Sequence, residues 1–154
     1  MPALARLHAD ALAAGMALGA TPETDLEEMH RSAVADERRL VLLAEVDGEA
    51  VGMAHVAPSG ASNAPHRAEV QRVAVAAGAR ASGVGRQLME SVEEAALQRG
   101  LTLLWLTTHD GTDACAFYEA LGYTKVGVMP EYSRRPDGSL AAAAFYAKVL
   151  RGSS

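Results

Sequence analysis

The sequence predicts an α/β fold in which a mixed central sheet has helices on both faces. Three observations favour this class: helical periodicity before residue 35, a strand–turn–strand pattern at residues 40–56, and two strand–helix units at residues 67–98 and 101–121. A short hairpin joins antiparallel strands, whereas a strand–helix–strand connection makes parallel neighbours. The sheet should therefore be antiparallel at first and parallel where the two strand–helix units meet.

The composition indicates one ordinary globular domain, residues 1–154, without a linker or an internal repeat. The formal net charge of -5 argues against a nucleic-acid partner. The single cysteine, Cys115, excludes an internal disulfide and favours a cytoplasmic location. The first apolar stretch is interrupted by Arg6, His8 and Asp10, so we expect neither a signal peptide nor a membrane partner.

Two helices are expected before the first strand. Residues 4–18 carry an apolar stripe at helical spacing, with Gly19 as the stop, and Thr21 is the expected N-cap of a second helix with Pro22 at its first position. No alternating run precedes the first helix, so either an edge strand is absent from the sheet or the protein extends upstream. An unpaired sheet edge invites pairing with another chain. We therefore expect a homodimer, or an edge covered by the termini.

The later elements follow from alternation, helical spacing and turn residues. Strands are expected at residues 40–46, 50–56, 67–75, 101–107, 126–129 and 141–150, and helices at residues 83–98 and 113–121. Asp47-Gly48 is typical of a type I′ hairpin turn. Gly100 and Gly122 mark helix ends, and Asp113 is the candidate cap of the last helix.

A glycine-containing loop joins an alternating strand to a helix. It carries Arg80, Gly83 and Gly85, and Arg86 follows directly. A helix start presents unpaired N–H groups and the positive end of the helix dipole, and glycine lets an anion approach the backbone. The two arginines add fixed positive charge. This unit predicts a pyrophosphate site, whereas the alternative is an ordinary core strand leading into a helix.

The Arg-x-x-Gly-x-Gly loop resembles the acetyl-CoA loop of the GCN5-related N-acetyltransferases, the GNAT superfamily. The resemblance implies a GNAT fold, acetyl-CoA as co-substrate, no metal, and direct acetyl transfer to the amine of a small molecule. In that superfamily the strand before the loop splays from its neighbour and leaves backbone groups for the pantetheine arm. The residues implied to contact acetyl-CoA are Val73, Ala74, Val75, Arg80, Ala81, Ser82, Gly83, Val84, Gly85, Arg86 and Phe117.

Glu69 is the candidate general base, because many GNAT enzymes place a glutamate six residues before the position of Val75. A base must take a proton from an ammonium nucleophile, directly or through water. Strand alternation predicts that Glu69, Gln71, Val73 and Val75 share one face. The alternative is a solvated carboxylate or an ion pair with Arg67.

Tyr118 is the candidate general acid. The segment Phe117-Tyr118, followed by Gly122-Tyr123, is similar to the superfamily segment whose tyrosine hydroxyl protonates the departing thiolate. The alternative is a core tyrosine. Many relatives also have asparagine seven residues earlier, where this chain has Gly111. Asp110, Thr112 or backbone groups are the candidate replacements.

The second half, roughly residues 66–150, is most similar to the tabtoxin-resistance branch, which acetylates a small amino-acid-like toxin. Thr107 stands where that branch has a second acid, so we expect a different acceptor. Two alternatives stay open: an acyl-CoA-binding regulatory or catalytically degenerate module, and a peptide N-terminal acetyltransferase. The five histidines do not have metal-ligand spacing.

Overall fold

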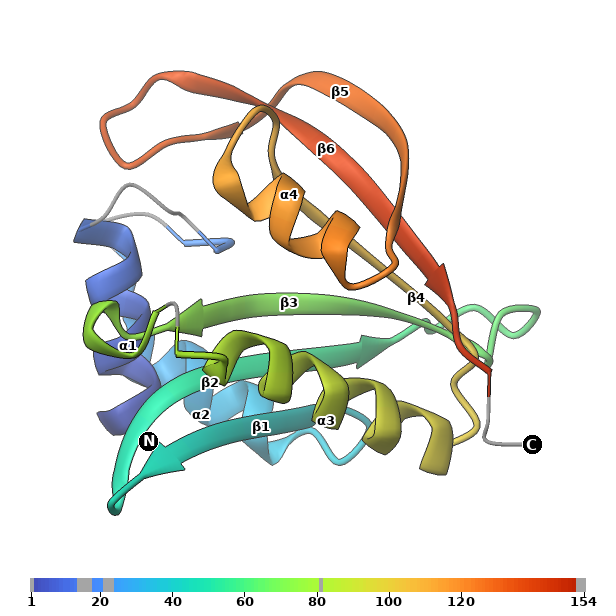
Figure 1. The fold of residues 1–154 in the computed structure, drawn as a ribbon, viewed down its shortest axis with the longest axis horizontal. Helices are drawn as coiled ribbons and strands as arrows, with labels where there is room; N and C mark the ends of the chain where they lie inside the picture. Colours follow the sequence, from blue (N-terminus) through green and yellow to red (C-terminus); the bar gives the residue numbers. More distant parts are fainter. Residues whose placement is uncertain (1, 14–17, 21–23, 81, 152–154) are drawn as a thin grey trace.

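The computed structural model describes residues 2–13, 18–20, 24–80 and 82–151 (Figure 1). Its elements, in chain order, are α1 (Pro2–Ala13), α2 (Leu26–Ala35), β1 (Leu40–Val46), β2 (Glu49–Pro58), β3 (Arg67–Val75), the 3₁₀ turn η1 (Ala77–Ala79), α3 (Val84–Gln98), β4 (Leu103–His109), α4 (Asp113–Ala120), β5 (Thr124–Arg134) and β6 (Leu140–Val149).

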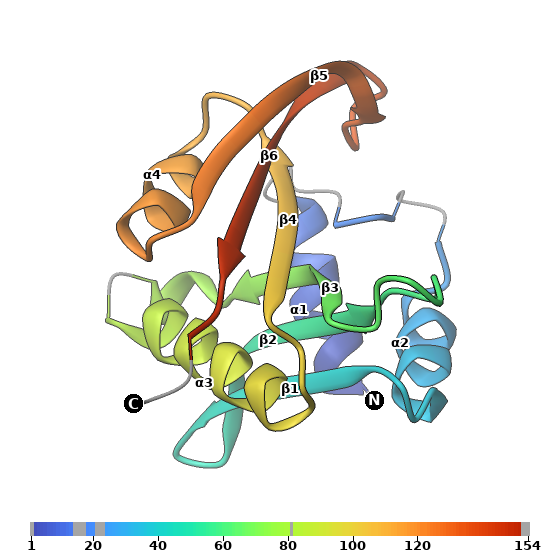
Figure 2. The ribbon, with the colours of Figure 1, turned by 90° about the vertical axis from the view of Figure 1, so that its right-hand side faces the viewer.

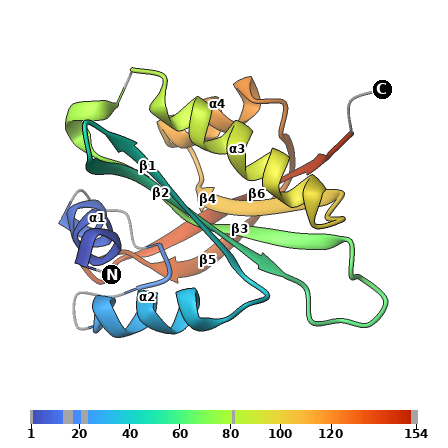
Figure 3. The ribbon, with the colours of Figure 1, turned by 90° about the horizontal axis from the view of Figure 1, so that it is seen from below.

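The strands form one mixed sheet in the order β1-β2-β3-β4-β6-β5. β3 and β4 are parallel, and the other neighbouring strands are antiparallel. Figures 2 and 3 show α1 and α2 on one face of the sheet and α3 and α4 on the other. The predicted fold class is confirmed, including the change from antiparallel to parallel pairing between the two strand–helix units.

The start of the chain differs in detail from the prediction. α1 ends at Ala13, and Leu18 lies in a turn with φ 50°, so the helix does not run to residue 18. The predicted start of the second helix at Thr21 and Pro22 lies outside the described residues. The described N-cap of α2 is Asp25, whose carboxylate accepts from the backbone N–H of Glu28 at 3.1 Å.

Two later boundaries also differ. Thr112, not Asp113, is the N-cap residue of α4, and Asp113 is its first helical residue. β5 continues beyond the predicted end at residue 129, although Pro130 interrupts the pattern. A register shift between Met129 and Ser133 accommodates the proline, which an edge strand tolerates because its outer N–H needs no ladder partner.

The sheet separates two apolar clusters. The larger lies against α3 and α4 and includes Val70, Leu88, Val92, Leu104, Tyr118 and Tyr146. The smaller lies under α1 and consists of Leu4, Leu7, Ala11, Met53 and Ala74. A polar link joins α3 to β6 across the larger cluster, because Glu93 accepts from the ammonium of Lys148 at 2.8 Å.

β3 contains a bulge that reverses its two faces. His55 of β2 pairs with Gln71, but Met53 pairs with Ala74, so β3 has one residue more than β2 over this stretch. Arg72 takes φ 52° at this place. Ala74 consequently packs under α1, whereas Val73 packs against the α3 cluster. The expectation that Glu69, Gln71, Val73 and Val75 share one face is wrong, because strict alternation does not survive a bulge.

β3 and β4 diverge soon after they meet. Their paired residues are Arg67 with Leu103, Ala68 with Leu104, and Glu69 with Trp105, and the described ladder stops there. Figure 1 shows the two strands close together near the start of β3 and widely separated at its end. The edge of β3 that faces β4 is thus open from residue 70 onward, beside the start of α3.

Candidate active site

The start of α3 presents an uncapped helix N-terminus. Gly83 precedes the helix with φ 86°, a left-handed conformation that favours glycine, and space is open where its Cβ would stand. The first turn contains no acidic residue, and Arg86 in it is exposed. Ser82 is exposed and its hydroxyl donates to the Ala79 carbonyl. These features fit a bound pyrophosphate; Ala81, the remaining predicted loop residue, lies outside the described residues.

Arg80 and Gly85, which the sequence predicted only as parts of the phosphate loop, also contact the end of β3 and the side chain of Phe117. The Arg80 Nε donates to the Val75 carbonyl at 3.1 Å, which ties the loop to the end of β3. A Cβ on Gly85 would lie 3.2 Å from the Phe117 ring and 3.7 Å from Val75. Gly85 therefore brings α3 close to α4, whereas Gly83 is the glycine with open space beside it. Val84, between them, is the first helical residue.

Tyr118 lies at the core end of an aromatic group. Its ring is 5.1 Å from Phe117, 5.8 Å from Tyr123 and 6.3 Å from Tyr146, measured between centroids. Burial raises the pKa of Tyr118 above its usual range, so its hydroxyl keeps its proton at neutral pH. Among the described residues, the contacts of Tyr118 are ring contacts and none is a hydrogen bond to its hydroxyl, whereas the fully buried side-chain oxygen without a partner is the Tyr146 hydroxyl.

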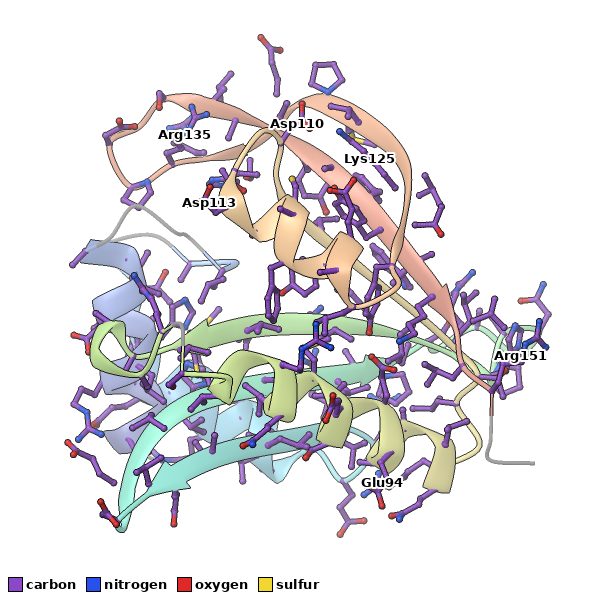
Figure 4. The ribbon with its side chains drawn as sticks, viewed as in Figure 1. Glu94, Asp110, Asp113, Lys125, Arg135 and Arg151 are labelled. Atoms are coloured by element: carbon purple, nitrogen blue, oxygen red, sulfur yellow. The ribbon has the colours of Figure 1, made fainter. Side chains whose placement is uncertain are left out.

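The side chains beside Gly111 already have partners. Lys125 donates to the Asp110 carboxylate at 2.9 Å, and Figure 4 shows the two labelled side chains near the turn between β4 and α4. The Thr112 hydroxyl donates to the His109 carbonyl at 2.7 Å. The neighbouring backbone is also engaged, because the Asp110 N–H donates to the Ala142 carbonyl and the Thr112 carbonyl accepts from the Cys115 N–H.

Glu69 belongs to a polar chain on the face of β3 that looks toward α1 and α2. The Gln71 amide donates to the Glu69 carboxylate at 2.8 Å and accepts from the Arg39 guanidinium at 3.1 Å. Arg67, the alternative partner, donates instead to the Ser59 hydroxyl at 3.3 Å. The half-buried Glu69 carboxylate is held by one amide, with acceptor capacity left for a further donor.

An aromatic wall stands on the same face, next to Glu69. Trp105, which pairs with Glu69 across the β3–β4 ladder, stacks on Phe145 with centroids 6.1 Å apart and an angle of 2°. Tyr132 meets the Phe145 ring edge-on at 5.4 Å. Thr107 pairs with Phe145 in the β4–β6 ladder. A hollow of about 390 Å³ is lined by Trp105 and Phe145 but not by Glu69. The wall therefore offers apolar surface to an organic group beside the strand position of Glu69.

A buried histidine chain is the feature that the sequence did not predict. His8 of α1, His30 of α2 and His55 of β2 are each fully buried. The His8–His30 nitrogens are 3.0 Å apart, the His30–His55 nitrogens 3.2 Å, and Arg72 reaches His55 at 3.5 Å. Residues 22 and 25 positions apart meet here only through folding, so the sequence carries no local signal of it.

Burial and nearby positive charge keep His30 and His55 neutral. Desolvation first, and then the nearby His8 and Arg72, lower the pKa of His30 to about 4. Desolvation and Arg72 lower the pKa of His55 to about 3. Two contacts link the three rings to one another, and no group of three or more metal-ligating side chains that could hold a metal occurs in the described residues.

A family model described as the acetyltransferase (GNAT) family matches residues 6–123. The chain belongs to the GNAT family. A ribosomal-protein-alanine N-acetyltransferase from Brucella melitensis is 30% identical with a TM-score of 0.84, and the match covers 97% of this chain and 93% of that one. The structure of yncA from Salmonella typhimurium, described as an acetyltransferase with its cofactor acetyl-CoA, has a TM-score of 0.83 at 18% identity, and the match covers 99% of this chain and 89% of that one.

Among curated proteins, a Xenopus tropicalis N-acetyltransferase named camello is 30% identical over 109 residues, 69% of this chain and 49% of its own length. The chain spans no more than about half the length of the curated relatives it matches. Among the described residues of this GNAT chain, no helix is long and apolar enough to cross a membrane.

Proposed function

We propose that the chain is an N-acetyltransferase that moves the acetyl group of acetyl-CoA directly to the primary amine of a small molecule in the cytoplasm. The observation that carries the proposal is the open edge of β3. It begins after Glu69, runs toward the uncapped start of α3, and separates a cationic loop from a polar face with an aromatic wall. A thioester arm fits along that edge, with an acceptor on the face that holds Glu69.

The residues that would hold acetyl-CoA fall in two groups. The backbone of residues 73–75 offers hydrogen bonds to an extended arm, because a strand without a neighbour gains when a ligand pairs its edge. The N–H groups of Val84, Gly85 and Arg86, with the Arg80 guanidinium, would bind the pyrophosphate. When bound, acetyl-CoA supplies an activated acetyl group as a thioester.

We assign proton transfer to Glu69 and Tyr118, which lie on opposite faces of the sheet beside the open edge of β3. Glu69 takes a proton from the acceptor ammonium, directly or through water, so that the amine nitrogen can attack the acetyl carbonyl carbon. The C–S bond then breaks, and the Tyr118 hydroxyl gives its proton to the departing thiolate. The second proton that the nitrogen loses on becoming an amide restores the Tyr118 hydroxyl through solvent, and the proton on Glu69 passes to water. Burial raises the pKa of Tyr118, so the hydroxyl is protonated before the step, although the same shift makes it a weaker acid than a free phenol.

A protein or peptide N-terminus is the second candidate acceptor. The similarity to the Brucella ribosomal-protein-alanine N-acetyltransferase favours it, at 30% identity over nearly all of both chains. The aromatic wall accommodates either type of acceptor. The resemblance to the tabtoxin-resistance branch enters the proposal through Thr107. Thr107 lies on the same face of the sheet as Glu69, at the position where that branch has a second acid, so we propose that the toxin is a poor acceptor here.

Steady-state CoA release with acetyl-CoA and a panel of amines tests the function. The panel contains amino acids, aminoglycosides, polyamines, tabtoxinine-β-lactam and short peptides. We expect turnover of at least one small amine and weak turnover of the toxin. Peptides as the best acceptors would select the second candidate, toxin turnover far above all others would contradict the altered specificity, and tight acetyl-CoA binding without turnover would identify a regulatory module.

A further inference from the structure

Arg72 is a half-buried guanidinium without an acidic partner. The exposed Arg31 pairs with Glu28 at 2.6 Å, and Arg39 lies 3.7 Å from Asp36. Arg72 instead makes one long contact, 3.5 Å, to the neutral imidazole of His55, and no other interaction of its side chain occurs in the described structure. Removing a cation from water without a counter-charge is unfavourable, so its remaining N–H donors are suited to an anion.

The histidine chain determines how that guanidinium is held. Arginine can only donate, so His55 Nδ1 must accept, and its proton must lie on Nε2. That N–H donates to His30 Nδ1, whose own proton therefore lies on Nε2 and is donated to His8 Nδ1. The N–H groups of the His55 and His30 rings therefore both point away from Arg72, each toward the next ring, and all three rings are fully buried. One edge of the guanidinium is thus fastened to the core, and the other edge is left for a ligand.

The free edge lies on the acceptor side of the sheet. Gln71 is paired with His55 in the β2–β3 ladder, and its side chain donates to Glu69 on the face toward α1 and α2. Arg72 joins this face because the bulge at φ 52° turns its side chain to His55. Glu69 and Arg72 are three residues apart on β3, and both side chains lie on this face because of the bulge.

Arg39, which directly precedes β1, adds a second positive charge near Arg72. It donates at 3.1 Å to Gln71, the residue next to Arg72. Desolvation first, and then repulsion by the charge of Arg39, lower the pKa of Arg72. Gln71 and Asp36 occupy Arg39. A bound anion would relieve this repulsion, whereas a purely cationic acceptor would increase it.

We propose that Arg72 binds an anionic group of the acceptor, so that the enzyme selects primary amines that also carry a carboxylate. The ammonium lies at Glu69, the carboxylate at Arg72, and the organic part against Trp105 and Phe145. This selectivity rests on the proposed function of the same site. The carboxylate can come from a free amino acid or from an acidic residue next to a peptide N-terminus. His55, with His30 and His8 behind it, is a positioning residue for the guanidinium.

The test compares matched acceptors: each free amino acid against its carboxamide, and a peptide with Glu as its second residue against the same peptide with Gln. For the wild type we expect kcat/KM to favour the carboxylate by at least about tenfold in one of the two series, mainly through KM. The series in which the preference appears identifies the source. Equal turnover of carboxylates and amides by the wild type would overturn the proposal.

Variants separate anion binding from a loss of structure. Arg72→Gln should reduce the carboxylate preference to about threefold or less while amide turnover stays nearly constant, and Arg72→Lys should retain part of it. His55→Leu should lower the preference partly, with an effect on KM and little on kcat. The control is Arg38→Gln, whose side chain is 78% exposed, and it should leave the preference unchanged. An equal decline for both acceptors in Arg72→Gln would mean a purely structural role.

Ligand binding without turnover distinguishes this proposal from the proposed function. With CoA present, the preferred amino acid or peptide should raise the thermal midpoint of the wild type, and its amide should do so less. Arg72→Gln should remove that difference. If no amine is acetylated but the difference is seen, the proposed function fails and the anion site stands. If amines are acetylated but no difference is seen, the anion site fails alone.

Discussion

The two faces of β3 come from one strand, yet one packs into the core and the other carries the polar groups of the candidate site. The face toward α3 presents Ala68, Val70 and Val73, which pack into the larger apolar cluster. The opposite face presents Glu69, Gln71 and Arg72, which form hydrogen bonds with Arg39 and His55. The apolar face holds the strand in the fold, so the polar face can leave donors and acceptors unused for a ligand.

The bulge at Arg72 makes this division functional. Without the extra residue, Arg72 would follow the alternation of Val70 and enter the apolar cluster, where a guanidinium is very unfavourable. With it, Arg72 joins Glu69 and Gln71, and Val73 takes the apolar side. The bulge lies beyond the last β3–β4 pair, where β3 has no neighbour on that side. It therefore places Val73 on the apolar face and Arg72 on the polar face in the part of β3 whose edge is open.

The largest expected effect is on the polar face. Glu69→Gln keeps the shape and the contact with Gln71 but cannot accept a proton, so kcat/KM at neutral pH should fall by about 10²- to 10⁴-fold. Gln71→Ala is the matched comparison, because it removes the hydrogen bonds of Gln71 to Glu69 and Arg39 but keeps the Glu69 carboxylate, and it should cost much less. Initial rates at saturating acetyl-CoA measure both.

Tyr118→Phe should slow turnover with unchanged acetyl-CoA affinity, and rates within a few-fold of wild type for both Glu69→Gln and Tyr118→Phe would refute the assigned base and acid.

The histidine chain should make folding stability depend on pH. Because the folded pKa is lowered to about 4 for His30 and about 3 for His55, the unfolded state binds more protons below its ordinary pKa. The contribution of these two histidines to the free energy of unfolding is fully present above about pH 6.5. It is lost as the pH falls toward 4 for His30 and toward 3 for His55, by up to roughly 1.4 kcal/mol per pH unit for each histidine. Urea midpoints at pH 7, 6 and 5 measure this. The exposed His66 is the control: His66→Gln should keep the full acid sensitivity, whereas His30→Gln should reduce it, and a flat profile in the wild type would contradict buried neutral histidines.

Gly83 and Gly85 should respond differently to the same added methyl group. In Gly83→Ala the left-handed φ of 86° costs about 1 kcal/mol of stability, without a clash. In Gly85→Ala the Cβ meets the Phe117 ring at 3.2 Å and must separate α3 from α4 slightly. Gly85→Val should enlarge that separation and weaken acetyl-CoA binding, measured by calorimetry against wild type and Gly83→Ala. Equal affinities in all four proteins would remove this loop from the proposed cofactor site.

The smallest expected effect concerns association through the sheet edges. β1 and β5 are the outer strands of the described sheet, and Val126 and Val128 of β5 are 65% and 46% exposed. An unpaired edge with apolar side chains favours a second copy of the chain, so we expect a weak, concentration-dependent dimer in light scattering. Val128→Lys should abolish it with no effect on acetyl-CoA binding, whereas a monomer at all concentrations would refute the dimer.

The sequence by itself determined the features that depend on neighbours in the chain. Asp47 and Gly48 form the expected hairpin turn because both adopt positive φ, 52° and 79°. Gly83 precedes α3 and Gly100 follows it for the same local reason. The α/β class follows as well, because the spacing of apolar residues specifies each helix and strand from its own residues.

The tertiary structure alone decided what depends on distant segments. The pairing of β3 with β2 sets the bulge, and the bulge, not alternation, decides which face Arg72 joins. The meeting of His8, His30 and His55 requires α1, α2 and β2 to pack together, and Gly85 gains its role only when Phe117 arrives on α4. Periodicity describes how one segment is shared between core and solvent, but a hydrogen bond between segments depends on their packing, which the spacing within either segment does not specify.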